Sequence, residues 1–322
     1  MKKVLAIALA LAMVFCLAAC GNGGKKEEPA TYQFGLGVSN SVTPKSATAE
    51  ANGSAQVNAT YAIILVDKDG KIAKCEFDVA QETVQVDATG VTTFNELPTK
   101  RERGYDYGMT KASPIGKDWF EQADHLAAQL IGLTKDEALA KLAVDDQQHA
   151  TNADVLAGCT IHINDFVEAL KNAFDHLEDA GAAVDIQLGT SISNTPKDGV
   201  SYQFNIYVGG SAKDADGKLT AVQIDCSQIT FTLDDKGTVT APEDLRSKFN
   251  KAEDYGMKKA SAIGKEWYEQ ADFLGESMEG KTVDEIKAMP VADGKATDAD
   301  VLAGFSMGHI DNFIEAVVKG WQ

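Results

Sequence analysis

The chain has 322 residues, of which 44% are hydrophobic and 24% are charged, and its formal net charge at pH 7 is −18. Such an excess of acidic residues argues against binding to nucleic acid or docking on an anionic lipid surface, because both repel a negatively charged protein. The length suits two domains of ordinary size, each able to bury a core of its own.

The N-terminal segment predicts export. Lys2 and Lys3 precede an apolar stretch from Val4 to Leu17, which is too short for a lasting membrane span and is typical of a signal peptide over residues 1–19. Leu17-Ala-Ala-Cys20 resembles the lipobox of bacterial lipoproteins; an ordinary secretory signal that ends in Cys is the alternative. The resemblance implies an acylated Cys20, a polar tether over residues 20–31 and a lipid anchor on the extracytoplasmic face of the cell membrane. Removal of the two lysines brings the net charge to −20.

The rest of the chain repeats itself. Asp106–Leu126 recurs as Asp254–Leu274 with sixteen of 21 positions identical. Two further segments recur in the same order: Leu36–Lys45 as Leu188–Lys197, and Thr151–Leu170 as Thr297–Val317. A repeat of this length indicates two copies of one domain rather than a solenoid. We expect copy one over residues 32–180 and copy two over 181–322, with the boundary at the helix end near Glu178–Ala183.

Each copy is predicted to begin with strands. Ala59–Val66 is rich in β-formers, Asp67–Gly70 reads as a turn, and Lys71–Val79 alternates, which together indicate a hairpin. In copy two the same reading gives Tyr202–Val208, Asp214–Gly217 and Leu219–Cys226. A second strand pair is expected over Glu82–Phe94 and over Gln228–Val239, the latter around a turn at Asp234–Gly237.

The second half of each copy is predicted to be helical. Helices are expected over Ile115–Leu130 and Ile263–Met278, with Trp119 and Trp267 on their apolar sides as core residues. Capping boxes at Thr134–Glu137 and Thr282–Glu285 predict two short helices, and final helices are expected over Ile163–Leu177 and Ile310–Lys319. Strands followed by helices indicate an α+β fold: two tandem homologous domains, each an antiparallel sheet followed by packed helices.

The sequence gives little support for a hydrolytic active site or a metal site. No nucleophile elbow, zinc-protease or phosphate-loop pattern is present in the sequence. Cys159 and His162 have a metal-like spacing, but copy two has Phe305 and Gly308 at those positions, so packed or solvated side chains are the favoured interpretation. No cysteine occupies equivalent positions in the two copies, which argues against a shared disulfide framework.

A hydroxyl group at fixed spacing from Asp and Gly is kept in both copies. The residues are Asp154, Gly158 and Thr160 in copy one and Asp300, Gly304 and Ser306 in copy two. Glycine permits close approach to a ligand or a positive φ. The hydroxyl lies just before the last helix, where backbone amides favour a phosphate, and a simple helix N-cap is the alternative. Thr151 and Thr297 with these aspartates are also possible capping pairs.

A second shared motif precedes the long helix. It consists of Tyr107, Gly108 and Met109 in copy one and of Tyr255, Gly256 and Met257 in copy two. These residues would line a flat ligand if they are functional, whereas a turn with a core-filling methionine is the structural alternative.

The hydroxyl segment resembles the D-x-x-S-G-A-T signature of FMN-binding domains of exported redox proteins. Val66–Ile72 and the Ser113-Pro-Ile-Gly116 stretch resemble further elements of that family, so the likeness covers most of each copy. The resemblance implies that a flavin transferase attaches FMN by a phosphoester to Thr160 and to Ser306. Ala157 and Ala303 replace the usual hydroxyl residue. Cys159 and Phe305 replace a small alanine, so the Phe305 ring would either block the flavin or stack on it.

Three functions remain open at this point. The first is a membrane-anchored electron carrier, not an enzyme, that relays electrons from a membrane quinone oxidase or another donor through flavin. The second is a non-redox surface lipoprotein that binds a ligand or a partner. The third is a structural or adhesive surface antigen.

Overall fold

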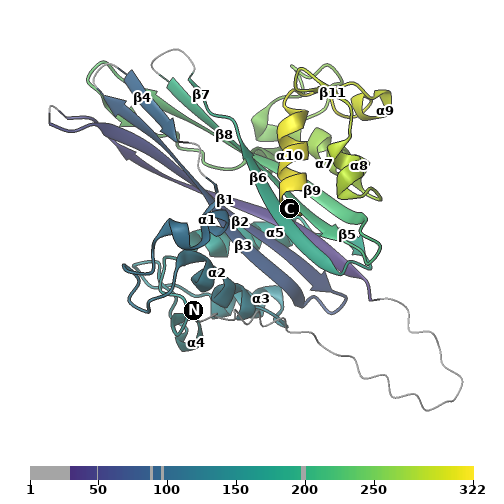
Figure 1. Cartoon of the computed structure of the whole chain (residues 1–322), viewed down its shortest axis with the longest axis horizontal. Coiled ribbons are helices and arrows are strands. Elements are labelled where there is room, and N and C mark those ends of the chain that lie inside the picture. Colours follow the sequence, from purple (N-terminus) through teal and green to yellow (C-terminus); the bar gives the residue numbers. More distant parts are fainter. Residues whose placement is uncertain (1–29, 49, 88–89, 96–97, 197–200) are drawn as a thin grey trace, which may run out of the picture.

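The computed structural model describes residues 30–48, 50–87, 90–95, 98–196 and 201–322 (Figure 1). It is an α+β protein in which antiparallel sheets are followed by helices, as the sequence predicts. Cys20, the expected signal peptide and nearly all of the tether lie outside the described residues. Within the described part, no helix is long and apolar enough to cross a membrane.

Sheet one is built from copy one and has the strand order β4-β3-β2-β1-β5. Its strands are β1 (Tyr32–Lys45), β2 (Gly53–Asp67), β3 (Ile72–Asp87), β4 (Gly90–Asn95) and β5 (Glu178–Gly181). The hairpin turn between β2 and β3 forms where expected, because the Asp67 carboxylate accepts the N–H groups of Asp69 and Lys71 and Gly70 adopts a positive φ. β5 pairs with β1 and covers the expected domain boundary, so this segment is a strand.

Sheet two repeats the arrangement with the order β10-β9-β8-β6, and β7 also pairs with β8. Its strands are β6 (Asp185–Ile192), β7 (Thr195–Pro196), β8 (Ser201–Lys213), β9 (Leu219–Leu233) and β10 (Val239–Thr240); the short pair β11 (Val291–Ala292) and β12 (Lys295–Ala296) lies apart. Asp214 and Asp234 organise the two predicted turns in the way Asp67 does.

The helices occur in matching order in the two copies. Copy one has α1 (Lys100–Arg103), the 3₁₀ turn η1 (Gly104–Tyr107), α2 (Trp119–Ala128), α3 (Lys135–Lys141), α4 (Ala153–Leu156) and α5 (Asn164–Asp175). Copy two has α6 (Lys248–Lys251), η2 (Ala252–Tyr255), α7 (Trp267–Met278), α8 (Val283–Lys287), α9 (Ala299–Leu302) and α10 (Ile310–Lys319). The capping boxes at Thr134 and Thr282 form as predicted. α2 starts four residues later than expected, because Asp118 caps it in a box with Glu121.

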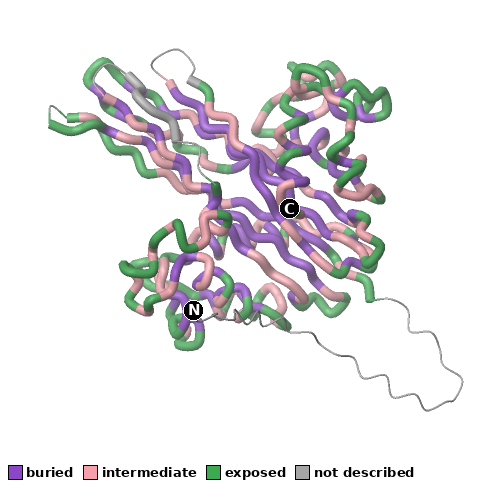
Figure 2. The backbone as a smooth tube through the Cα atoms, viewed as in Figure 1, coloured by how far each residue is buried: buried purple, intermediate pink, exposed green. Residues whose placement is uncertain are grey.

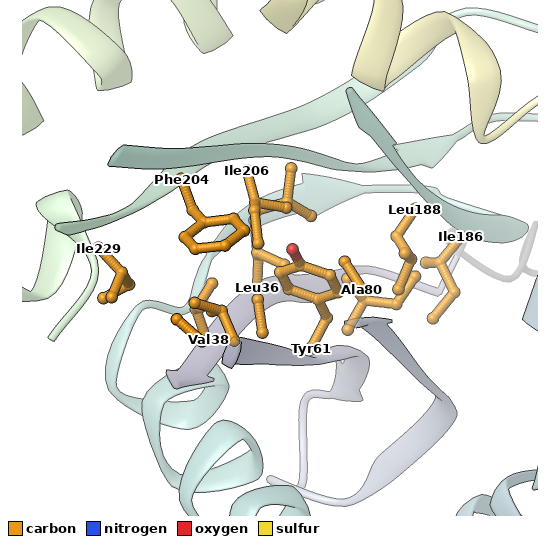
Figure 3. Close-up of a cluster of buried hydrophobic side chains, with 14 of the residues drawn as sticks. Leu36, Val38, Tyr61, Ala80, Ile186, Leu188, Phe204, Ile206 and Ile229 are labelled. Atoms are coloured by element: carbon orange, nitrogen blue, oxygen red, sulfur yellow. The ribbon is translucent and has the colours of Figure 1, made fainter. Parts of the chain in front are cut away.

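The two sheets pack face to face, and each carries its helices on the opposite face, which gives helix, sheet, sheet and helix layers (Figure 1). Strand β2 shows why the layers form, because its side chains point alternately to the two faces of sheet one. Tyr61, Ile63 and Leu65 point into a core shared with sheet two, whereas Ala62 and Ile64 point into the helices of copy one. Figure 3 shows the shared core, with Leu36, Val38 and Tyr61 opposite Phe204 and Ile206. The copies therefore share one core in addition to the core that each makes with its own helices.

The terminal helices lie very close to their sheets. A Cβ atom on Gly37 of β1 would come within 2.0 Å of the Ala169 carbonyl of α5, and one on Gly189 of β6 within 2.4 Å of the Ala316 carbonyl of α10. The helices cover only one end of each sheet. The other end of each sheet extends beyond the helices (Figure 2). A cavity can form where the helical layer stops.

The Tyr61 hydroxyl is a buried polar group in the shared core. The residue is fully buried, and among the described residues its oxygen has no hydrogen-bond partner. Burial, followed by the nearby Asp78, raises the pKa of Tyr61 well above its ordinary value. We expect Tyr61→Phe to raise the free energy of unfolding by about 1 kcal/mol, because it removes an unpaired buried hydroxyl and keeps the ring.

Urea denaturation of the purified chain measures this effect. Tyr61→Leu is the control, which should lower the stability by about 2–4 kcal/mol because the ring is lost. A clear loss of stability in Tyr61→Phe would mean that the hydroxyl has a partner in solution.

Candidate functional site

Each copy has a cavity at the edge of its helical layer, and each cavity contains the repeated hydroxyl. In copy one the cavity has a volume of about 590 Å³ and is lined by Thr160, Tyr107 and Met109. In copy two the equivalent cavity has about 420 Å³ and is lined by Ser306, Tyr255 and Met257. Thus three of the six predicted residues of each copy come together at one site.

A buried glutamine holds the hydroxyl in copy one. Gln122 of α2 is fully buried, and its Oε1 atom accepts hydrogen bonds from the Thr160 N–H at 2.8 Å and from Thr160 Oγ1 at 3.3 Å. The Gln122 Nε2 group donates to Ser113 Oγ and to the Lys117 carbonyl, both at 3.1 Å. Because both ends of the amide are fixed, the position of the Thr160 side chain is fixed too.

Copy two contains the same network. The Gln270 Oε1 atom accepts from the Ser306 N–H at 2.9 Å and from Ser306 Oγ at 3.2 Å, and its Nε2 group donates to Ser261 Oγ at 3.0 Å. The two glutamines were not among the predicted site residues. Their signal in the sequence is that a serine and a glutamine nine positions apart are kept in both copies.

The residue before each hydroxyl points away from the cavity. Cys159 and Phe305 are both fully buried in the core between helices and sheet, and Phe305 packs edge-on against Phe313. The expectation that Phe305 would block or stack on a ligand is therefore wrong, since Ser306 lines the cavity and Phe305 does not. The helix N-cap alternative is wrong as well, because Ile163 and His309 hold those positions.

Gly158 and Gly304 allow close packing of the loop against the neighbouring helix. A Cβ atom on Gly158 would lie 2.4 Å from the His125 ring of α2, and one on Gly304 would lie 2.2 Å from the Phe273 ring of α7. The close approach is thus to a side chain of the protein itself. Gly108 and Gly256 have φ angles of 80° and 72° and end the 3₁₀ turns, so their role is conformational.

The repeated aspartates lie outside the cavities. Asp154 and Asp300 are exposed on the short helices α4 and α9 and line neither cavity. Asn152 and Asp298 cap these helices, so the predicted capping by Thr151 and Thr297 is wrong. The backbone carbonyl of Asp154 instead contacts His125 Nε2 at 2.9 Å.

A lysine that was not predicted lies in each cavity. Lys100 Nζ lies 5.2 Å from the ring centre of Tyr107 and 5.7 Å from that of Trp119, and Lys248 repeats this arrangement over Tyr255 and Trp267 at 5.3 and 5.7 Å. Burial lowers the pKa of Lys100 to about 8, partly opposed by Asp78 and Asp165. The predicted core tryptophans are buried as expected, and their rings also support these cations.

A pair of histidines lines the cavity of copy one, whereas His309 lines that of copy two. The rings of His149 and His162 meet edge to face with centres 4.6 Å apart. Cys159 is buried in the core while His162 lines the cavity, so the metal-like pair of the sequence is not brought together. Across the described residues there is no group of three or more His, Cys, Asp or Glu side chains that could hold a metal ion.

No protein-family model, curated protein or solved structure matches the chain. The two cavities, each with a glutamine-bound hydroxyl, a lysine and a tyrosine, are therefore interpreted from their own chemistry.

Proposed function

We propose that the chain is an exported, lipid-anchored electron carrier that bears FMN on the hydroxyl of Thr160, and to a lesser extent on that of Ser306. The observation that carries this proposal is that in each copy a glutamine-bound hydroxyl lines a cavity of ligand size. The hydroxyl, its glutamine partner and its place at the cavity recur in both copies, although the residues on either side of the hydroxyl differ.

The residues of copy one suit a phosphate-linked flat ring. The cavity volume of about 590 Å³ falls within the usual range for small-molecule sites. Tyr107, Met109 and Ile161 offer aromatic and flexible apolar surface for a ring, and Lys100 offers positive charge for a phosphate. The cavity of copy two is smaller, which favours copy one as the main site.

Attachment would proceed at Thr160 Oγ1. A flavin transferase would form the bond between this oxygen and phosphorus while the pyrophosphate bond of FAD breaks and AMP leaves, and the hydroxyl proton would pass to solvent or to a base of the transferase. Gln122 holds the oxygen in place during this step but supplies no base, since its amide is neutral. Bound FMN would supply one- or two-electron transfer, with a membrane quinone oxidase or another donor as the source of electrons.

The alternative is a non-redox lipoprotein that binds a ligand or a partner through the same cavities. The exposed positions of Asp154 and Asp300 favour it, because these carboxylates belong to the flavin-like motif of the sequence but line neither cavity. On either view, export and anchoring at Cys20 remain proposals that rest on the N-terminal sequence.

Mass spectrometry tests the proposal. The chain is expressed with a bacterial flavin transferase, and a covalent FMN mass is expected on the peptide that contains Thr160. Thr160→Ala should remove this mass, whereas Thr151→Ala, at an exposed threonine bonded to the Ala143 carbonyl, should retain it. If the chain stays unmodified while the same transferase modifies a known substrate protein, flavin attachment is excluded and the binding function remains.

A further inference from the structure

Three side-chain amides lie together on the outer face of sheet one, where the helices end. Asn58 of β2 stands opposite Gln81 of β3 in the sheet register, and Gln56 lies two residues away on the same face. Asn58 Oδ1 accepts from Gln81 Nε2 at 2.9 Å and from Gln56 Nε2 at 3.3 Å. We call Gln56, Asn58 and Gln81 the amide cluster of copy one.

Copy two contains the same cluster. Asn205 Oδ1 accepts from Gln203 Nε2 at 2.9 Å and from Gln228 Nε2 at 3.0 Å, and Asn205 stands opposite Gln228 in the register. In copy two the cluster also reaches the shared tyrosine, because Tyr255 donates to Gln228 Oε1 at 3.3 Å, and in copy one Tyr107 and Gln81 line the same cavity. Charged residues are absent from both clusters, although the chain as a whole is rich in them.

The clusters differ in one donor group. Asn205 Nδ2 donates to the Ser193 carbonyl at 3.0 Å, and neither Asn205 nor Gln228 lines the cavity of copy two. Asn58 Nδ2 has no acceptor among the described residues, and both Asn58 and Gln81 line the cavity of copy one. Copy one thus presents a fixed, neutral donor to its cavity, while copy two uses the same donor internally.

We infer that Asn58 recognises a carbonyl of a neutral heterocycle in the cavity of copy one, namely the dioxopyrimidine edge of flavin if the proposed function holds. Asn58 is held by two accepted bonds and offers a free NH₂ group with two N–H donors, which matches a ring edge that carries carbonyl oxygens. Gln81 supports this orientation directly, because its Nε2 group donates to Asn58 Oδ1. The cavity of copy two does not make this contact, so ring recognition belongs to copy one.

Asn58→Asp tests the inference with little change in shape. The carboxylate still accepts from Gln56 and Gln81 but replaces the free donor with a negatively charged oxygen. Riboflavin is the probe, because it has no phosphate and its binding does not depend on attachment at Thr160. Quenching of its fluorescence by the purified full chain should show that Asn58→Asp weakens binding about tenfold or more, since a carbonyl would then face an anion.

Asn205→Asp is the matched control and should leave riboflavin binding within about twofold, as neither Asn205 nor Gln228 lines the cavity of copy two. Asn58→Ser, which is small and neutral, guards against misfolding, and it should also weaken binding while thermal unfolding stays close to that of the wild type. Equal effects of the Asn58 and Asn205 variants, or wild-type protein that does not bind riboflavin, would overturn the inference.

Measurements on protein with covalently attached flavin distinguish a failure of this inference from a failure of the proposed function. In flavin-loaded chain, Asn58→Asp should shift the visible absorption maxima and lower the midpoint potential of the flavin, whereas Asn205→Asp should not. If FMN is found on Thr160 but Asn58→Asp changes neither property, ring recognition by Asn58 fails and the carrier function stands. If no FMN is attached to either copy, the carrier function fails independently of riboflavin binding.

Discussion

We expect that the two copies, produced separately as residues 30–181 and 182–322, do not fold as stable monomers. Each piece would expose its half of the core between the sheets, including Phe34 and Tyr61 in the first and Phe204 and Phe231 in the second. Burial of one large apolar side chain contributes about 1.5–3 kcal/mol, whereas a whole domain is stable by only about 5–15 kcal/mol. The loss of several such residues therefore exceeds the stability that one copy retains from its own helices.

Size-exclusion chromatography, dye binding and thermal melting of each piece measure this outcome. We expect aggregation or a swollen state that binds a hydrophobic dye, and recovery of a cooperative transition when the pieces are refolded together. The control is the full chain cleaved once after Gly181, in which both sheets remain paired and the fold should survive. A monomeric, cooperatively melting copy one alone would show that the helix-side core suffices.

The sequence predicted those elements whose causes are local. Asp-x-Asp-Gly turns and Thr-x-x-Glu capping boxes satisfy backbone groups within a few residues, so the turns at Asp67 and Asp214 and the starts of α3 and α8 were found. The cavity hydroxyls were also found, because comparison of the two copies separates Thr160 from the drifting residues on either side of it.

What the sequence did not predict depends on contacts far apart in the chain. β1 and β6 were missed because Gly37 and Gly189 interrupt their patterns, and only the closeness of α5 and α10 explains those glycines. The shared core was missed because a strand buried on both faces, such as β2, does not reveal what covers each face. The roles of Gly158 and Phe305 likewise depend on which way the loop turns its side chains.

Gln122→Leu should both destabilise copy one and abolish flavin attachment at Thr160. Leucine fills a similar volume but leaves the Thr160 N–H and the Lys117 carbonyl without their buried partner, which costs about 2–4 kcal/mol in total. The Thr160 hydroxyl also loses the acceptor that fixes its position. Chemical denaturation measures the first effect, and the FMN mass on the Thr160 peptide, determined well below the unfolding transition, measures the second.

Two further variants decide whether Gln122 positions the hydroxyl or only stabilises the fold. Gln270→Leu breaks the matching network of copy two, so it should destabilise the chain by a similar amount and leave the Thr160 modification intact. Gln122→Glu keeps an acceptor for Thr160, so it should restore part of the modification even though a buried carboxylate destabilises the chain. If Gln122→Leu is destabilised but still carries FMN at the wild-type level, the network is structural, and the transferase must orient the hydroxyl by itself.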